Sequence, residues 1–276
     1  MSAVRYQVHA AVAEITLEHP PVNALTEEMV GQLLDALQRA AADAGVRAVV
    51  LASAVPRRFC AGLDLQALNA APPEKIHALL DKLYTALCDA QFRLGKPSIA
   101  AVAGAARGGG MTLAISCDML VAGRSATFGY PEIDVGLLPA IHFTHLPRIV
   151  GRHRAFDLLF TGRSFGAAEA MGLGIVSRVV DDDLVLQEAR SIAQRLAGKA
   201  PSAMRIGRMA FLRAIDNDTR RGVAAAVETF CAIATSGDGR EGVAAFCEKR
   251  QPVWPQPQPQ SQSQSISEPP ETRADA

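Results

Sequence analysis

The chain has 276 residues, with 28 basic and 28 acidic side chains, and 49% of its residues are hydrophobic. A formal charge of zero excludes general affinity for nucleic acid, because binding to phosphates needs a basic excess. No apolar run reaches the roughly 18 to 20 residues that a membrane span requires, and the N-terminus lacks the layout of a signal peptide. We therefore expect a cytoplasmic, globular protein with neither a nucleic-acid nor a membrane partner.

Strand-like and helix-like patterns alternate along most of the chain. Residues 12–17 alternate as a half-buried strand does, and Thr26 begins a helix whose apolar residues recur at helical spacing up to Gly45. Further strands are predicted at 46–52, 59–61, 98–103, 119–122, 126–129 and 175–180, and helices at 77–92, from the glycines 108–110 to before Cys117, and over most of 184–248. This order predicts an α/β core followed by a helical C-terminal portion.

The C-terminal segment differs from the rest in composition. From Pro255 it reads PQPQPQSQSQSISEPPETRADA, which has too little apolar surface to offset the entropy lost on ordering the backbone. We predict a disordered tail over residues 255–276.

Two glycine-bearing turns lie where a predicted strand meets a helix. One is FCAGLDL, which contains Gly62, and the other is GAARGGGMT, which contains Gly109. A glycine-rich turn at a helix start exposes backbone N–H groups that have no acceptor within the helix. Two such turns brought together would form a pair of donors for a developing oxyanion. Taken alone, either turn is explained by tight packing of a helix on a strand.

A glutamate, Glu132, follows in the segment FGYPEIDVGLLP. Its sequence neighbours are apolar, and a carboxyl group in such surroundings has a raised pKa and can act as an acid or a base near neutral pH. In isolation, a glutamate at the surface or at a helix cap is the commoner explanation.

The segments FCAGLDL, KPSIAAVAGAARGGG and FGYPEIDVGLLP, in this order, resemble the crotonase superfamily of enoyl-CoA hydratases and isomerases. The resemblance runs from about Tyr6 to Trp254. It implies a ββα spiral that binds acyl-CoA, over residues 1–198, and a helical region for trimerisation, over residues 199–254. Homotrimers or hexamers are expected.

The resemblance also implies the roles of individual residues. The backbone N–H groups of Leu63 and Gly109 would bind the thioester oxygen, and Glu132 would be the acid or base. Residues 63–66 (Leu63, Asp64, Leu65 and Gln66) would lie along the CoA moiety, and Lys249 would reach its phosphates. No metal and no separate cofactor are expected, because coenzyme A is part of the substrate.

The sequence departs from the family pattern at Thr112, where typical hydratases have a second glutamate after the glycines. One carboxylate suffices to shift a double bond, whereas hydration asks for two groups. The pattern thus favours a Δ3–Δ2 enoyl-CoA isomerase, with an enoyl-CoA hydratase and a noncatalytic CoA-binding protein as alternatives. A second departure is the segment AIHFTH, where His142 is either an auxiliary base or a histidine with structural hydrogen bonds near a helix start.

Overall fold

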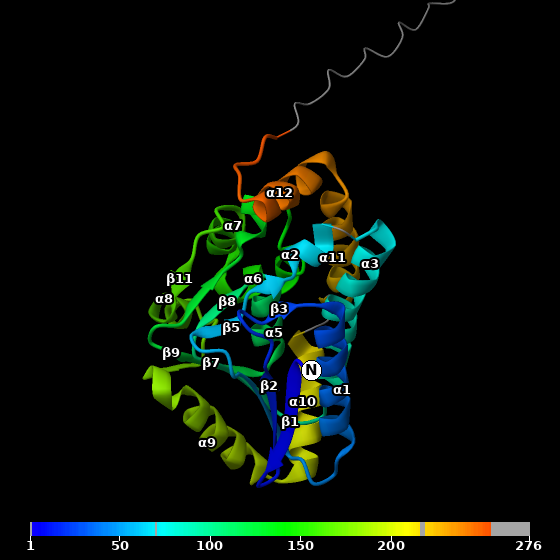
Figure 1. Cartoon of the computed structure of the whole chain (residues 1–276). Helices are drawn as coiled ribbons and strands as arrows, with labels where there is room; N and C mark the ends of the chain where they lie inside the picture. The colour runs from blue at the N-terminus through cyan, green and yellow to red at the C-terminus, as the bar shows by residue number, and fades with distance from the viewer. Residues whose placement is uncertain (1, 70, 216–218, 255–276) are drawn as a thin grey trace, which may run out of the picture.

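The computed structural model describes residues 2–69, 71–215 and 219–254. A six-stranded sheet has the order β1-β2-β4-β7-β9-β12, a four-stranded sheet has the order β11-β10-β8-β5, and β3 pairs with β6 (Figure 1). The strands are β1 (Val4–His9), β2 (Val12–Leu17), β3 (Ala24–Leu25), β4 (Ala48–Ser53), β5 (Arg58–Cys60), β6 (Gly62–Leu63), β7 (Ser98–Val102), β8 (Ala105–Arg107), β9 (Met119–Gly123), β10 (Thr127–Gly129), β11 (Phe165–Gly166) and β12 (Arg178–Val180).

Helices account for most of the remaining described residues. The helices are α1 (Glu27–Ala42), α2 (Leu65–Asn69), α3 (Pro73–Leu80), the π-helix η1 (Asp81–Ala86), α4 (Leu87–Arg93), α5 (Gly109–Ser116), the 3-10 helix η2 (Pro131–Val135), α6 (His142–Val150), α7 (Arg152–Phe160), α8 (Ala167–Gly172), the 3-10 helix η3 (Asp182–Leu184), α9 (Val185–Ala197), α10 (Pro201–Ile215), α11 (Thr219–Ala234) and α12 (Gly237–Glu248). No helix in the described ranges is long and apolar enough to cross a membrane.

The two larger sheets arise from a repeated strand–strand unit. In the pairs β4–β5, β7–β8 and β9–β10, the first strand joins the six-stranded sheet and the second joins the four-stranded sheet. A helix follows each pair, or, after β9–β10, the 3-10 helix η2. All neighbouring strands of the six-stranded sheet are parallel except β1 and β2. The predicted α/β fold with a ββα spiral is thus confirmed.

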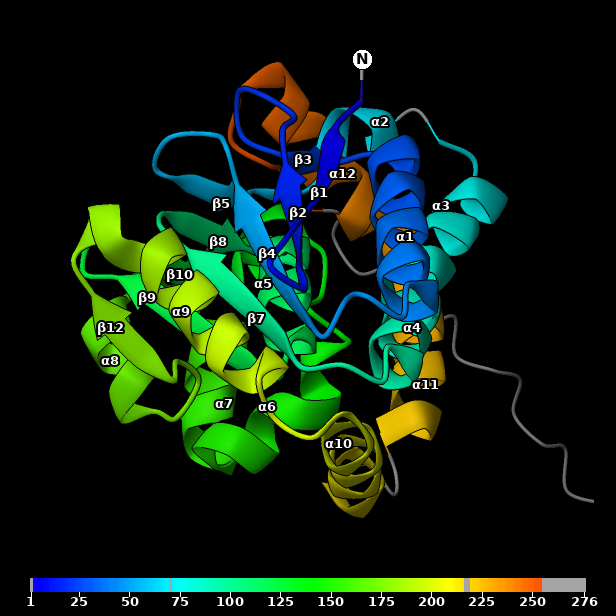
Figure 2. The same cartoon turned by 90° about the horizontal axis from the view of Figure 1, so that it is seen from below.

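Helix α5 lies at the centre of the molecule, in contact with both larger sheets. Its first six residues, from Gly109 to Ala114, are all buried, as expected for a helix that is apolar on every side. The opposite face of the six-stranded sheet is covered by α9, whose Ala189 and Ile192 pack against Val50 and Ile99 (Figure 2). The start of α5 is therefore fixed by packing from two sides.

The longer elements mostly follow the sequence prediction, whereas the short strands β3, β6, β8 and β11 were not predicted. The strand 12–17 is β2, and Thr26 caps α1 by accepting a hydrogen bond from the N–H of Met29 at 3.2 Å. The strand β1 was not predicted, and the helix expected at 77–92 contains the π-helical segment η1. The strand predicted over 175–180 is wrong in its first half: the N–H groups of Ile175 and Val176 donate to Ala170 and close α8 instead.

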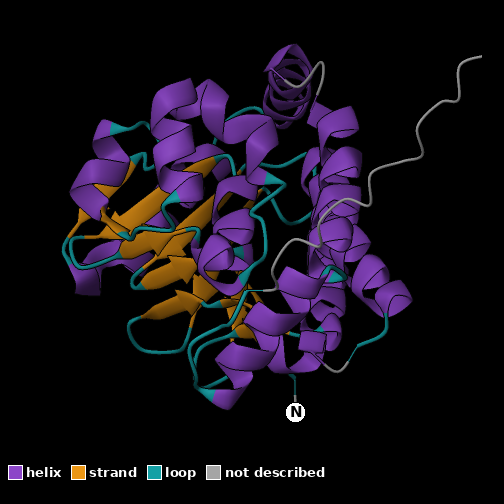
Figure 3. Ribbon diagram, turned by 90° about the horizontal axis from the view of Figure 1, so that it is seen from above, coloured by secondary structure: helices purple, strands orange, loops and turns teal. Residues whose placement is uncertain are grey.

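Three helices of the described residues, α10, α11 and α12, form the C-terminal portion. Figure 3 shows how helices surround the strands of the molecule. Helix α11 packs against η1, α3 and α6, and α12 packs against α2 and η2. Buried residues of both helices, including Phe230 and Val243, belong to the main hydrophobic core. Helix α12 thus contacts the two short helices next to the predicted site. The predicted tail, 255–276, lies outside the described residues.

Candidate active site

The two glycine-bearing turns meet in the folded protein. Gly62 has φ +93°, and a Cβ atom added to it would lie 3.0 Å from the carbonyl oxygen of Arg107 and 3.2 Å from the backbone nitrogen of Gly109. A side chain at Gly62 would therefore be strained by its backbone conformation and would press against the other turn. The close approach that the sequence left open is present.

The N–H of Gly109 has no acceptor within its own helix. Gly109 is the first residue of α5, and the residue before it, Gly108, provides no side-chain cap. The first N–H groups of a helix have no acceptor within it and carry the positive end of the helix dipole. This end of α5 is therefore suited to bind a negatively charged oxygen.

Leu63 follows Gly62 in β6, a strand that contacts α5. The N–H of the next residue, Asp64, donates to the carbonyl of Leu25 in β3 at 3.1 Å. Because successive N–H groups of an extended chain point in opposite directions, the N–H of Leu63 points away from β3. The two turns that carry Leu63 and Gly109 thus lie side by side, and the joint role of their N–H groups stays a prediction.

The other residues predicted to bind CoA have more varied surroundings. Asp64 accepts hydrogen bonds from the N–H groups of Gln66 and Ala67 at 3.0 and 3.2 Å, so its carboxylate caps α2. Gln66 is exposed. Lys249 is exposed at the end of α12, two residues beyond Cys247, whose Sγ lies 3.8 Å from the carbonyl oxygen of Leu65. The end of α12 is therefore held beside the start of α2.

Glu132 has a buried carboxyl group. The residue as a whole is half-buried, but its Oε2 is inaccessible to solvent and has no hydrogen-bond partner among the described residues. A Cβ atom on Gly108 would lie 2.8 Å from its Oε1, so only glycine lets the carboxyl approach the start of α5. Burial raises the pKa of Glu132 to about 7, with a smaller opposing effect of its own backbone N–H. This group can both take up and release a proton near neutral pH.

Two buried tyrosines near Glu132 were not identified from the sequence. Burial raises the pKa of the Tyr84 and Tyr130 phenols, and the charge of Glu132 is the next largest cause for both. Tyr130 lies in the same motif as Glu132, whereas Tyr84 belongs to η1, a π-helix that no residue pattern indicated. These rings make the surroundings of the carboxyl apolar.

Thr112 lies one helical turn beyond Gly108 and contacts the buried His142, which in turn contacts the half-buried His145. Its Oγ1 is 3.3 Å from Nε2 of His142, and Nδ1 of His142 is 3.3 Å from Nε2 of His145. Burial lowers the pKa of both imidazoles, that of His145 to about 4. For His142 the second cause is His145, while the Gly108 carbonyl acts in the opposite direction. Both histidines are therefore neutral at physiological pH.

A cavity of about 1060 Å³ extends beyond Thr112 between α4, α5, α6, α10 and α11. Thr112, Ser116 and His145 line it, whereas Glu132, Leu63 and Gly109 do not. Thr112 therefore links the start of α5 to this cavity, which is mainly apolar.

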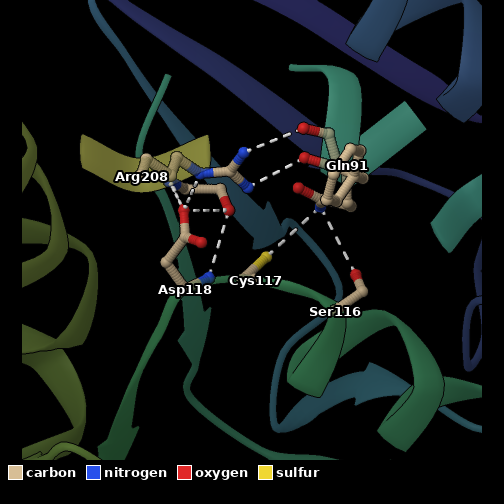
Figure 4. Close-up of polar contacts among 7 residues, drawn as sticks. Gln91, Ser116, Cys117, Asp118 and Arg208 are labelled. Carbon is tan, nitrogen blue, oxygen red and sulfur yellow. Dashed lines mark hydrogen bonds and ion pairs between the residues drawn. The ribbon is translucent and has the colours of Figure 1, made fainter. Parts of the chain in front are cut away.

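The far wall of the cavity carries an ion pair between the buried Arg208 and the more exposed Asp118 (Figure 4). Nε of Arg208 in α10 donates to Oδ2 of Asp118 at 2.8 Å, and its other nitrogens donate to the carbonyls of Gln91 and Phe92. Asp118 also accepts from the N–H of Ser98. Through these hydrogen bonds, Arg208 joins α10 to the core.

Comparison of the sequence with known proteins finds relatives over most of the chain. The model of the family described as enoyl-CoA hydratase/isomerase matches residues 7–258. A probable enoyl-CoA hydratase of Mycobacterium leprae is 36% identical, with 87% of this chain and 93% of that protein covered. A human protein named enoyl-CoA hydratase domain-containing protein 2, mitochondrial, is 37% identical, with 87% and 84% covered.

Solved structures agree with these matches. An enoyl-CoA hydratase/isomerase from Pseudoalteromonas atlantica superposes with a TM-score of 0.81 at 31% identity, covering 92% of this chain and 100% of that chain. An enoyl-CoA hydratase from Mycobacterium avium subsp. paratuberculosis has a TM-score of 0.82 at 24% identity, covering 92% and 99%; this second likeness concerns the fold alone.

Proposed function

The chain belongs to the enoyl-CoA hydratase/isomerase family, and from this premise we propose that it binds an acyl-CoA thioester and stabilises the enolate formed from it. The N–H groups of Leu63 and Gly109 are the donors to the thioester oxygen. Donors of this kind contribute about 3 kcal/mol each when they are preorganised toward the developing charge. The packing of Gly62 against Gly109 supplies that preorganisation.

Glu132 is the proposed acid and base, and the reaction it supports best is the Δ3–Δ2 isomerisation of an enoyl-CoA. The ionised carboxyl takes a proton from C2, the electron pair moves into the thioester, and the protonated carboxyl then returns the proton to C4. A pKa of about 7 suits a group that must be base and acid in one cycle. The observation that carries this proposal is the single buried, unpartnered carboxyl beside the start of α5.

Hydration of a 2-enoyl-CoA is the second candidate. It is favoured by the names of the relatives, several of which are called enoyl-CoA hydratases. Hydration needs a group that holds the attacking water in addition to the proton-transferring carboxyl.

Separate assays with a 3-enoyl-CoA and a 2-enoyl-CoA test these proposals. Turnover of the first supports the isomerase, and hydration of the second supports the hydratase. Loss of turnover in Glu132→Gln with unchanged CoA affinity rules out the alternative of a noncatalytic CoA-binding protein. Turnover that survives this substitution contradicts the role assigned to Glu132.

The cavity beyond Thr112 is the proposed place of the acyl chain. Its volume of about 1060 Å³ lies at the upper end of the range of small-molecule sites, which is roughly 300 to 1,000 Å³. Lys249, exposed at the end of α12, is the proposed contact for a CoA phosphate.

We also propose that the protein forms homotrimers or pairs of them. Large apolar side chains are exposed on the helices α6, α7 and α10, namely Phe143, Phe156, Phe160, Ile206, Phe211 and Ile215. The Phe143 and Phe156 rings both stack on Phe160. Apolar groups gathered in this way favour burial against another subunit. Sedimentation of the purified protein tests this proposal.

A further inference from the structure

A chain of side-chain contacts leads from Thr112 to a backbone carbonyl of α6. After the contacts of Thr112 with His142 and of His142 with His145, Nδ1 of His145 lies 3.4 Å from Oγ1 of Thr144. Oγ1 of Thr144 in turn donates to the carbonyl of Ile141 at 2.7 Å. His142 is 1% exposed and its ring lies 4.5 Å from that of Tyr130, so the imidazole cannot turn freely.

The last contact fixes the direction of every hydrogen bond before it. The hydroxyl proton of Thr144 goes to the carbonyl of Ile141, the shortest contact, so its oxygen must accept from Nδ1–H of His145. A neutral imidazole carries one proton, so Nε2 of His145 accepts from Nδ1–H of His142. Nε2 of His142 then has only a lone pair, and it accepts the hydroxyl proton of Thr112.

A competing partner for the His142 ring is the carbonyl of Gly108. This carbonyl already accepts from the N–H groups of Met111 and Thr112, at 2.8 and 3.2 Å, which uses both of its lone pairs. The hydroxyl proton of Thr112 is therefore donated to His142. Its oxygen has lone pairs left, and Thr112 lines the cavity.

From this we infer that Thr112, oriented by His142, is the hydrogen-bond acceptor for the oxygen at C3 of the substrate: the attacking water during hydration, or the hydroxyl of a 3-hydroxyacyl-CoA. The inference rests on the proposed function, because it places the thioester at Leu63 and Gly109. It gives the site an activity beyond isomerisation, with His142 as a positioning residue.

The step balances with one carboxyl. Water donates one proton in a hydrogen bond to Oγ1 of Thr112 and loses the other to the ionised Glu132 as its oxygen bonds to C3. The electron pair of the C2–C3 double bond moves into the thioester as the enolate. Glu132 then gives the proton to C2, which yields the 3-hydroxyacyl-CoA and restores the carboxylate.

The test compares two reactions in the same variants: hydration of crotonyl-CoA and isomerisation of 3-hexenoyl-CoA. Thr112→Val keeps the shape of the side chain and removes the acceptor, and we expect hydration to fall by about 10- to 100-fold while isomerisation changes little. His142→Phe is expected to act in the same direction, and Thr112→Ser to retain hydration. Thr229→Val, the same exchange at an exposed position of α11 outside the cavity lining, is the matched control and should change neither rate.

A binding measurement gives a readout that is independent of turnover. The wild-type protein should bind 3-hydroxybutyryl-CoA more tightly than butyryl-CoA, and Thr112→Val should lose this preference while binding butyryl-CoA as before. Equal loss of both reactions in Thr112→Val and Thr112→Ser would assign Thr112 a structural role and overturn the inference. Isomerisation without any hydration in the wild type would also overturn it and leave the proposed function intact, whereas absence of both reactions would refute the proposed function itself.

Discussion

The buried carboxyl of Glu132 links activity to stability. Burial raises its pKa from 4.5 to about 7, so the folded protein binds this proton more tightly than the unfolded chain does. The stability that depends on this group is therefore full below about pH 4.5 and is lost as the pH rises to about 7. At about 1.4 kcal/mol per pKa unit, the total is about 3 kcal/mol, and the part lost between pH 5.5 and pH 8 is about 2 kcal/mol.

The substitution Glu132→Gln keeps the shape of the side chain and removes its charge. We expect turnover to fall by about 100- to 10,000-fold, the usual contribution of a general acid or base. The stability of the variant relative to wild type, measured as the difference in free energy of unfolding, should be about 2 kcal/mol larger at pH 8 than at pH 5.5. Urea unfolding of both proteins at the two pH values measures this difference, and comparing the two cancels any effect of the amide that does not depend on pH.

Glu74→Gln is the control, because Glu74 is exposed on α3 and its replacement removes no buried charge. It should show almost no change in relative stability between the two pH values. A pH-independent difference for Glu132→Gln, or a smaller relative stability at pH 8 than at pH 5.5, would refute the reasoning that burial of an unpartnered carboxylate costs stability here.

Three further outcomes are expected. The rate of isomerisation at low substrate concentration should rise about tenfold per pH unit and level off near pH 7, because Glu132 must be ionised to act as the base; a pH–rate profile measures this. Gly62→Ala should cost about 1 to 3 kcal/mol of stability through its positive φ and lower turnover by about 100-fold by displacing the N–H of Gly109, as measured by urea unfolding and steady-state kinetics. Arg208→Met should lower the free energy of unfolding by about 1 to 3 kcal/mol, because the carbonyl of Gln91 and the carboxylate of Asp118 lose their hydrogen-bond donor; Arg213→Met, at an exposed position of the same helix, should cost little in the same measurement.

Each of these expectations has an outcome that contradicts it. A flat profile between pH 5.5 and 8 would exclude Glu132 as the titrating base. Wild-type turnover in Gly62→Ala would mean that the two turns need not touch for oxyanion binding. Equal stability of the Arg208 and Arg213 variants would mean that the ion pair on the cavity wall contributes nothing.

The sequence alone determined the elements whose signals are local. Thr26 predicts the start of α1 because a capping hydroxyl acts within one turn, and it caps that helix. The two turns could be identified because a close approach of two backbone segments requires glycine. Glu132 could be identified because it is an acidic residue among apolar sequence neighbours. The strand predicted at 175–180 was wrong in its first half because the N–H groups of Ile175 and Val176 complete the end of α8, a choice that the apolar pattern does not encode.

What only the tertiary structure decided is which groups meet. From the sequence, Thr112 is a poor substitute for a carboxylate, because a threonine hydroxyl has a pKa far above neutral. Folding brings His142, thirty residues away, against its hydroxyl, and the contacts with His145 and Thr144 decide which atom carries each proton. Likewise, the pKa of Glu132 depends on burial, which Tyr84 of η1 contributes from a distant part of the chain. The residue types are local, but hydrogen-bond direction and desolvation are properties of neighbours in space.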